Sequence, residues 1–153
     1  MLNGHVDVIQ VIYNIFEQEP VAGILPVAKE NNVGVMVRVA FDEGVLTGKY
    51  KAESKFGEGD FRNSYFEGDR LGRAVERVKK IEEEIKDTDL TMPQLALKYP
   101  LMHDAVSAVI PGIRNTYQAF ANTAVSDLES LTPDLLKRLQ KHYWHRGVWY
   151  SGK

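Results

Sequence analysis

A short turn in the last third of the chain carries residue types that could bind a phosphate group. The apolar run Ser107–Ile110 leads to Gly112, Arg114 and Asn115, and a helix-like segment follows. A glycine lets the backbone approach a ligand closely, and an arginine donates two parallel hydrogen bonds to a phosphate. Asn115 suits a helix N-cap, with Gln118 three residues later in capping-box spacing. A capped surface helix with a solvated arginine would use the same residues, so the turn alone leaves both interpretations open.

The elements that must position this turn follow from the apolar pattern. Strands rich in β-branched residues are predicted over residues 6–14, 33–41 and 105–111. Helices are predicted over residues 20–32, 70–87, 91–103, 115–125 and 132–144. The connections between strands are long enough for helical crossovers, which predicts a parallel sheet, and the apolar strands predict burial on both faces. In parallel α/β folds, ligands bind beyond the carboxyl ends of the strands, where the turn before Asn115 would lie.

The helix over residues 70–87 has the clearest periodicity. Its predicted buried stripe consists of Leu71, Ala74, Val75, Val78, Ile81 and Ile85. Its Glu and Lys residues are interpreted as the solvated face. Thr91 and Thr132 have the residue type and position of N-caps, and Pro100 is expected to end or kink its helix. The segment between residues 42 and 69 reads as a long loop, which in a compact domain is usually functional or mobile.

Composition excludes several classes of function. The chain has 153 residues, of which 44% are hydrophobic and 26% are charged, and its net charge is -2. This charge gives no sign of the basic surface typical of proteins that bind nucleic acids or anionic membranes. It has no cysteine, which excludes disulfides and thiolate metal sites. No apolar run reaches membrane-spanning length and the first residues do not read as a signal peptide. We therefore expect a cytoplasmic protein with no membrane or nucleic-acid partner.

Four segments together resemble a known family. The runs QVIYN, EGVLTGKY, LALKYPLMHDAVSAVIPG and IRNTYQAFANTAV are similar to segments of aldo-keto reductases and occur in the same order. The resemblance extends from about Val6 to Trp149. It implies an α/β fold, a partial (β/α)8 TIM barrel made of the last three β/α units plus a C-terminal helix. Residues 1–153 would form a single C-terminal half-barrel domain.

The resemblance also implies an NADP cofactor and a small carbonyl substrate. Gln10 would bind the nicotinamide carboxamide, and Arg38 would stack on the nicotinamide ring. The residues matching the loop at the pyrophosphate are Phe41, Asp42, Gly44 and Leu46. The residues matching the contacts to the ribose 2′-phosphate are Gly112, Ile113 and Arg114. Gln118 and Asn122 would reach the adenine.

The match departs from the family pattern at two places, and several residues have a purely structural alternative. Val39–Ala40 replaces the commoner Ser-Pro, and Ala121 replaces a glutamate. Gln10 would otherwise be a satisfied buried amide, and Arg38 would otherwise form an ion pair with Asp42 or Glu43.

Aromatic and histidine residues outside these motifs are interpreted as packing groups. Tyr13 is expected in the core. His142 and His145 have helical spacing that could suit a metal, but no third ligand is evident, so packing of the tail is favoured.

The motifs that hold the family's catalytic aspartate, tyrosine, lysine and histidine have no match in this chain. We expect NADP(H)-dependent reduction of aldehydes or ketones for the parent enzyme, and no activity from this chain alone, with no catalytic residue assigned. The alternatives are a non-catalytic interaction module, an inactive truncated fragment, and a general parallel α/β domain whose turn is structural. Because the outer strands would lack their barrel neighbours, a homo-oligomer formed through open sheet edges is also expected.

Overall fold

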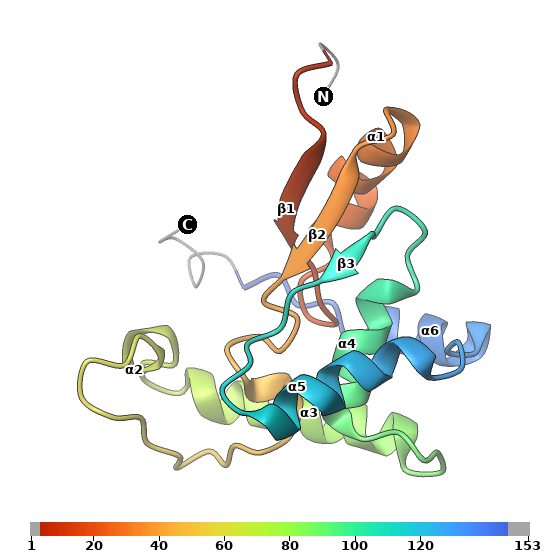
Figure 1. The fold of residues 1–153 in the computed structure, drawn as a ribbon. Coiled ribbons are helices and arrows are strands. Elements are labelled where there is room, and N and C mark those ends of the chain that lie inside the picture. Colours follow the sequence, from red (N-terminus) through yellow and green to blue (C-terminus); the bar gives the residue numbers. More distant parts are fainter. Residues whose placement is uncertain (1–3, 147–153) are drawn as a thin grey trace.

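Three parallel strands and the helices that follow them make up the computed structural model, which describes residues 4–146 (Figure 1). The strands are β1 (Val8–Ile12), β2 (Gly34–Arg38) and β3 (Ala108–Val109), and they pair in the order β1-β2-β3. The helices are α1 (Ile24–Glu30), α2 (Arg62–Tyr65), α3 (Arg70–Ile85), α4 (Met92–Leu101), α5 (Thr116–Thr123) and α6 (Pro133–Gln140). Short 3-10 turns are η1 (Glu19–Ala22), η2 (Val45–Thr47) and η3 (Ala124–Asp127). The parallel sheet predicted from the sequence is confirmed.

The sheet buries only one of its faces. Val35 and Val37 of β2 are fully buried on the helix side. On the opposite face, Gln10 pairs in register with Met36, and Met36 pairs with Ala108. The members of this open face are exposed or half-buried, with Val8 at 51%. The prediction of strands buried on both faces is therefore wrong, because in residues 4–146 the apolar pattern of β1 has no cover on that side.

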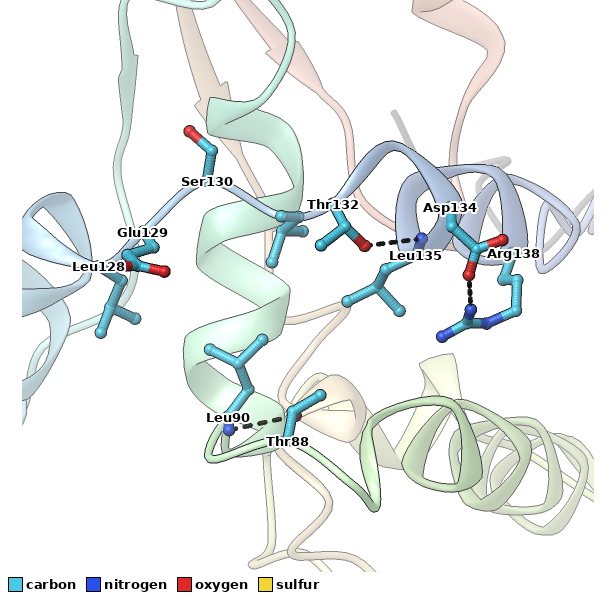
Figure 2. Close-up of a pocket in the computed structure, with 10 residues that line it drawn as sticks. Thr88, Leu90, Leu128, Glu129, Ser130, Thr132, Asp134, Leu135 and Arg138 are labelled. Carbon is cyan, nitrogen blue, oxygen red and sulfur yellow. Dashed lines mark hydrogen bonds and ion pairs between the residues drawn. The ribbon is translucent and has the colours of Figure 1, made fainter.

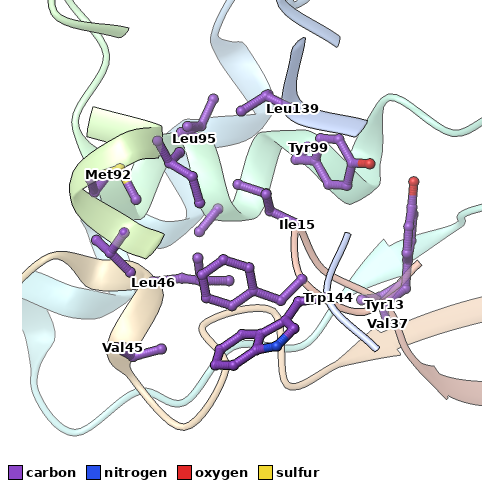
Figure 3. Packing of buried hydrophobic residues seen from close by; sticks show 14 of the residues in the cluster. Tyr13, Ile15, Val37, Val45, Leu46, Met92, Leu95, Tyr99, Leu139 and Trp144 are labelled. Carbon is purple, nitrogen blue, oxygen red and sulfur yellow. The ribbon is translucent and has the colours of Figure 1, made fainter. Parts of the chain in front are cut away.

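The core lies between the sheet and the helices (Figure 3). The whole predicted stripe of α3 is buried, from Leu71 to Ile85. It meets apolar side chains from the β1–α1 connection, η2, α4, α6 and the C-terminal segment, among them Ile15, Leu46, Leu95, Leu139 and Trp144. Tyr13, 4% exposed, belongs to this core as predicted and lies 5.6 Å from Tyr99 between ring centroids. Within residues 4–146, no helix is long and apolar enough to cross a membrane.

Helix ends follow the predicted caps more closely than the predicted lengths. Thr91 forms a full capping box with Gln94, and the Thr132 hydroxyl accepts the Leu135 N–H. The helix predicted over residues 20–32 is instead split, because the chain breaks at Gly23 between η1 and α1. Helix α4 ends at Leu101, one residue after its internal proline, as a proline without an amide hydrogen favours.

The predicted loop over residues 42–69 contains η2 and α2 and an aromatic cluster. The rings of Tyr50, Phe56 and Phe66 lie with centroids 5.3 to 6.4 Å apart. The Arg62 guanidinium lies 4.6 Å from the centroid of Phe56 and donates a hydrogen bond of 2.5 Å to the Tyr50 hydroxyl. Phe66 belongs to the main core, and Tyr50 and Phe56 pack against it, so these rings attach the long segment to the rest of the fold.

Candidate functional site

The predicted site residues lie on segments that leave the carboxyl ends of the strands. In Figure 1 the three arrowheads point the same way, and the chain after β2 and the chain before α5 both leave from that end. Arg38 is the last residue of β2, and Gly112 and Arg114 lie in the connection from β3 to α5. This is the end where parallel α/β folds bind ligands, because the loops there can vary without disturbing the sheet.

Arg38 lies half-buried on the open face of the sheet. In the register of β1 and β2 it pairs with Ile12 and is on the same face as Gln10. The structural alternative was an ion pair with Asp42 or Glu43. Within residues 4–146, Arg38 has no carboxylate at ion-pair distance, and Asp42 is paired with another arginine. The charge of Arg38 acts on Glu43 only as a long-range field that lowers its pKa, against the larger effect of burial, which raises it.

The chain after Arg38 adopts an unusual backbone. Val39, Asp42 and Glu43 have φ values of 57°, 47° and 55°, and Gly44 has 94°. A left-handed conformation costs about 1–3 kcal/mol at a residue with a side chain, most of all at a β-branched one. Strain of this kind persists only where the surrounding structure holds it and is common in ligand-binding loops.

Two buried side chains, those of Asn14 and Asp42, hold this strained turn through hydrogen bonds. The Asn14 amide donates a hydrogen bond of 2.9 Å to the Val39 carbonyl. The Asp42 carboxylate, fully buried, accepts hydrogen bonds of 2.9 and 2.7 Å from Nη1 of Arg146 and one of 3.1 Å from the Tyr65 hydroxyl. The side chain of Asp42 is thus engaged by the protein, and a contact between Asp42 and a cofactor would come from its main chain.

The other three predicted residues of this loop play different parts. Phe41 is half-buried and packs on the core, and Leu46 is fully buried in it. Gly44 is required by its own geometry, because its φ is 94° and an added Cβ would lie 2.8 Å from the Tyr50 hydroxyl oxygen. These residues shape the loop rather than present side chains beyond it.

The turn that precedes α5 has the predicted cap and free space beside it. Asn115 Oδ1 accepts the Gln118 N–H at 2.8 Å, and Gln118 Oε1 accepts the Arg114 N–H at 2.7 Å. Nothing lies within 4 Å of a Cβ built on Gly112, so packing within the described part of the chain does not explain a glycine there. Ile113, 52% exposed, and Arg114 also face solvent.

The charge of Arg114 acts on Asp60, which precedes α2. Hydrogen bonds from Arg62 hold the pKa of Asp60 well below its usual range, and the field of Arg114 lowers it further. The guanidinium of Arg114 itself has no ion pair with any carboxylate of residues 4–146.

The remaining two predicted residues differ in their surroundings. Asn122 is half-buried on α5, and its Nδ2 is buried without a hydrogen-bond partner in residues 4–146. A buried amide donor without a partner is costly, and a ligand with acceptor atoms would satisfy it. Gln10 is exposed on the open sheet face, which excludes the alternative of a satisfied buried amide within the described part of the chain.

The histidines of the C-terminal segment have separate neighbours. His142 lies 3.7 Å from Glu84, and His145 lies 3.0 Å from Glu19. Within residues 4–146, no group of three His, Asp or Glu side chains is placed to hold a metal ion.

A mostly apolar hollow of about 370 Å³ lies elsewhere, at the start of α6 (Figure 2). Leu90, Leu128 and Leu135 line it, and none of the predicted site residues does. At its rim the Thr132 hydroxyl caps α6, and Asp134 pairs with Arg138. The side chains of Thr132, Asp134 and Arg138 are therefore already engaged in structural contacts.

Sequence reasoning missed Arg146, Tyr65 and Asn14. A signal was present for Arg146, because an aspartate flanked by Phe41 and the apolar η2 needs a cation if it is buried. The sequence could not show which cation, since 104 positions separate Asp42 from Arg146.

The model of the Aldo/keto reductase family matches residues 4–143. A curated relative, the Schizosaccharomyces pombe aldo-keto reductase yakc, named with NADP(+), is 32% identical over 71% of this chain and 34% of its own length. A probable voltage-gated potassium channel subunit beta from Arabidopsis thaliana is 29% identical over 84% of this chain and 41% of its own. The solved glycerol dehydrogenase of Gluconobacter oxydans superposes with a TM-score of 0.77 at 23% identity, covering 88% of this chain and 41% of that one.

The chain belongs to the Aldo/keto reductase family. Its fold is part of the family's (β/α)8 barrel, with three parallel strands and their helices. The chain spans between a third and about two fifths of the length of the relatives it matches.

Proposed function

We propose that this chain provides the part of an aldo-keto reductase that binds NADP(H), without the residues that transfer the proton. The bound nicotinamide would supply a hydride to the carbonyl of an aldehyde or ketone. The chain's own residues would bind and orient the cofactor: Arg38 and Gln10 at the nicotinamide, the turn at Gly112–Arg114 at the 2′-phosphate, and Asn122 at the adenine.

The observation that carries this proposal is the pair of cations left without partners. Arg38 and Arg114 lie on the carboxyl side of β2 and β3, and neither has an ion pair in the described part of the chain. Arg38 is half-buried, and a half-buried arginine without a carboxylate is unfavourable unless a ligand compensates its charge or covers its planar face. Arg114 is exposed, so its guanidinium is accessible to a phosphate group. The unpartnered Nδ2 of Asn122 and the space beside Gly112 support the same ligand.

The direct test of this proposal is cofactor binding without turnover. Titration of the purified chain with NADPH, followed by the fluorescence of the nicotinamide, should give a saturable signal that Arg38→Met weakens. A mixture of chain, NADPH and 4-nitrobenzaldehyde should show no oxidation of NADPH above the buffer rate, because general acid catalysis alone contributes about 10²–10⁴-fold. Turnover that survives removal of contaminants would overturn the inactive assignment, and absence of saturable binding would overturn the cofactor assignment.

The open sheet supports a second proposal, that the chain associates with further copies of itself. Within residues 4–146, the outer edges of β1 and β3 have no neighbouring strand, and Val8 and Ile110 are 51% and 43% exposed. Unpaired edges and exposed apolar residues promote association. The likeness to a probable voltage-gated potassium channel subunit beta is consistent with an interaction role.

Light scattering over a hundredfold dilution tests this association. A mass above 17.3 kDa that falls on dilution is expected. The variant Val8→Lys should shift the balance to the single chain, whereas Ile24→Lys, on α1, should leave it unchanged. A constant mass of one chain at every concentration would contradict self-association, and the cofactor proposal would stand independently.

A further inference from the structure

The buried pair of Asp42 and Arg146 connects the strained turn after β2 to the C-terminal segment. Both side chains are fully buried, and Nη1 of Arg146 contacts both carboxylate oxygens of Asp42. The same Nη1 also donates to the Tyr65 hydroxyl at 3.1 Å, and that hydroxyl donates to Asp42 Oδ1. Three segments that are distant in the sequence therefore meet on one carboxylate.

The guanidinium of Arg146 also lies against two aromatic rings. Its central carbon lies 5.7 Å from the ring centroid of Phe16 and 5.3 Å from that of Trp144. The main-chain N–H of Trp144 donates to the main-chain carbonyl of Phe16 at 2.9 Å. The contacts with Phe16 and Trp144 fix the position of Arg146 in the core. Because Arg146 also binds Asp42, it links the core to the turn.

The turn needs such an anchor because its backbone does not favour its own conformation. Val39, Asp42 and Glu43 all lie in the left-handed region, which residues with a Cβ avoid. Asn14 fixes the start of this stretch at the Val39 carbonyl, and Arg146 fixes its middle at Asp42. Conformations of this kind are retained where surrounding contacts determine them, and they commonly serve ligand sites.

We propose that Arg146 is a positioning residue for the cofactor loop. With Tyr65, it holds Asp42 and thereby keeps residues 39–44 in the conformation that the loop has when NADP(H) is bound. This inference rests on the proposed function for its cofactor readout, but the positioning of the loop is testable without any ligand. Arg146 acts through Asp42, so it sets the affinity of the site and contacts no reacting atom.

Hydrogen exchange followed by mass spectrometry tests the positioning on the full chain. In Arg146→Met, amides in residues 39–48 should exchange at least about tenfold faster and become less protected than amides in α3, whose remaining protection should match the lowered stability of the whole chain, because the loop opens before the chain unfolds. The control is Arg138→Met, which removes the ion pairs with Glu84 of α3 and with Asp134 of its own helix α6 and should leave residues 39–48 unchanged. Protection of residues 39–48 equal to that of α3 in Arg146→Met, or equal acceleration in both variants, would overturn the proposal.

A milder variant keeps the test decisive if Arg146→Met does not fold. Tyr65→Phe removes one hydrogen-bond donor to Asp42 and retains the ion pair, so exchange should rise about two- to fivefold in residues 39–48 alone. NADPH affinity should also fall in these variants, and it should fall less in Arg146→Lys than in Arg146→Met. If the unmodified chain fails to bind NADPH, the proposed function fails, and the exchange data still decide whether Arg146 positions the loop. Exchange of residues 39–48 unchanged in Tyr65→Phe and Arg146→Lys would contradict it.

Discussion

Nη1 of Arg146 lies 2.7 Å from Oδ2 of Asp42, and both side chains are completely buried. This contact joins the loop after β2 to the segment after α6, so the loop and the C-terminal segment belong to one packed unit. A charge on either side chain is tolerated there only because the other is present, since isolated charges are strongly disfavoured away from water.

Loss of one partner should therefore destabilise the whole chain. We predict that Arg146→Met lowers the free energy of unfolding by about 3–5 kcal/mol, because Asp42 is left as an uncompensated buried charge. Urea denaturation measures this. Arg138→Met, which removes partly exposed ion pairs, should cost about 1 kcal/mol or less. The double variant Asp42→Asn with Arg146→Met should recover part of the loss. Equal effects of the two arginine variants would refute this role of the pair.

Substitution of two glycines in the candidate site by alanine should affect different properties: stability for Gly44 and NADPH affinity for Gly112. Gly44→Ala is expected to lower stability by more than about 1 kcal/mol, because Gly44 has a φ of 94° and the new Cβ would meet the Tyr50 hydroxyl at 2.8 Å. Gly112→Ala meets open space and should change stability by less than about 0.5 kcal/mol while weakening NADPH. Thermal unfolding and NADPH titration of both variants measure these effects. A stable Gly44→Ala chain, or Gly112→Ala with unchanged affinity, would count against the loop geometry or the ligand contact respectively.

Acidification should destabilise the chain through His142. Burial lowers the pKa of His142; Glu84 opposes this, and Arg77 and Lys80 add to it. The unfolded chain then binds more protons between the lowered pKa and the ordinary value of about 6.5, so stability is complete above that value and falls as the pH drops through the window. His103 has a pKa lowered by burial and adds to the same trend. Midpoints of urea unfolding at pH 7.5 and 5.5 should differ less in His142→Gln than in the unmodified chain, and an unchanged difference would disprove the assignment.

Local patterns predicted local structure well. The buried residues from Leu71 to Ile85 repeat with the helical period, and each capping threonine is close in sequence to the amide that it binds. Both features could therefore be predicted from neighbouring residues. The exposure of one sheet face could not be predicted from the sequence, because an apolar strand has the same composition whether or not another layer covers it.

The candidate site was predictable only in part for the same reason. The cap at Asn115 follows from adjacent residues, whereas the partner of Asp42 depends on tertiary packing. Arg38 was recognised as a charge that needs an explanation, and the structure removes the two ion pairs that would have supplied one within the described residues.

The most direct test of the proposed cofactor site compares the affinities for NADPH and NADH, measured by calorimetric titration of the unmodified chain and of Arg114→Ala. NADPH should bind more tightly to the unmodified chain, because the guanidinium at the start of α5 matches a 2′-phosphate dianion. One charge-assisted hydrogen bond contributes about 1.5–3 kcal/mol, so Arg114→Ala should weaken NADPH by about tenfold or more and leave NADH nearly unchanged. Equal affinities for the two cofactors in the unmodified chain, or an equal loss of both in Arg114→Ala, would contradict the account.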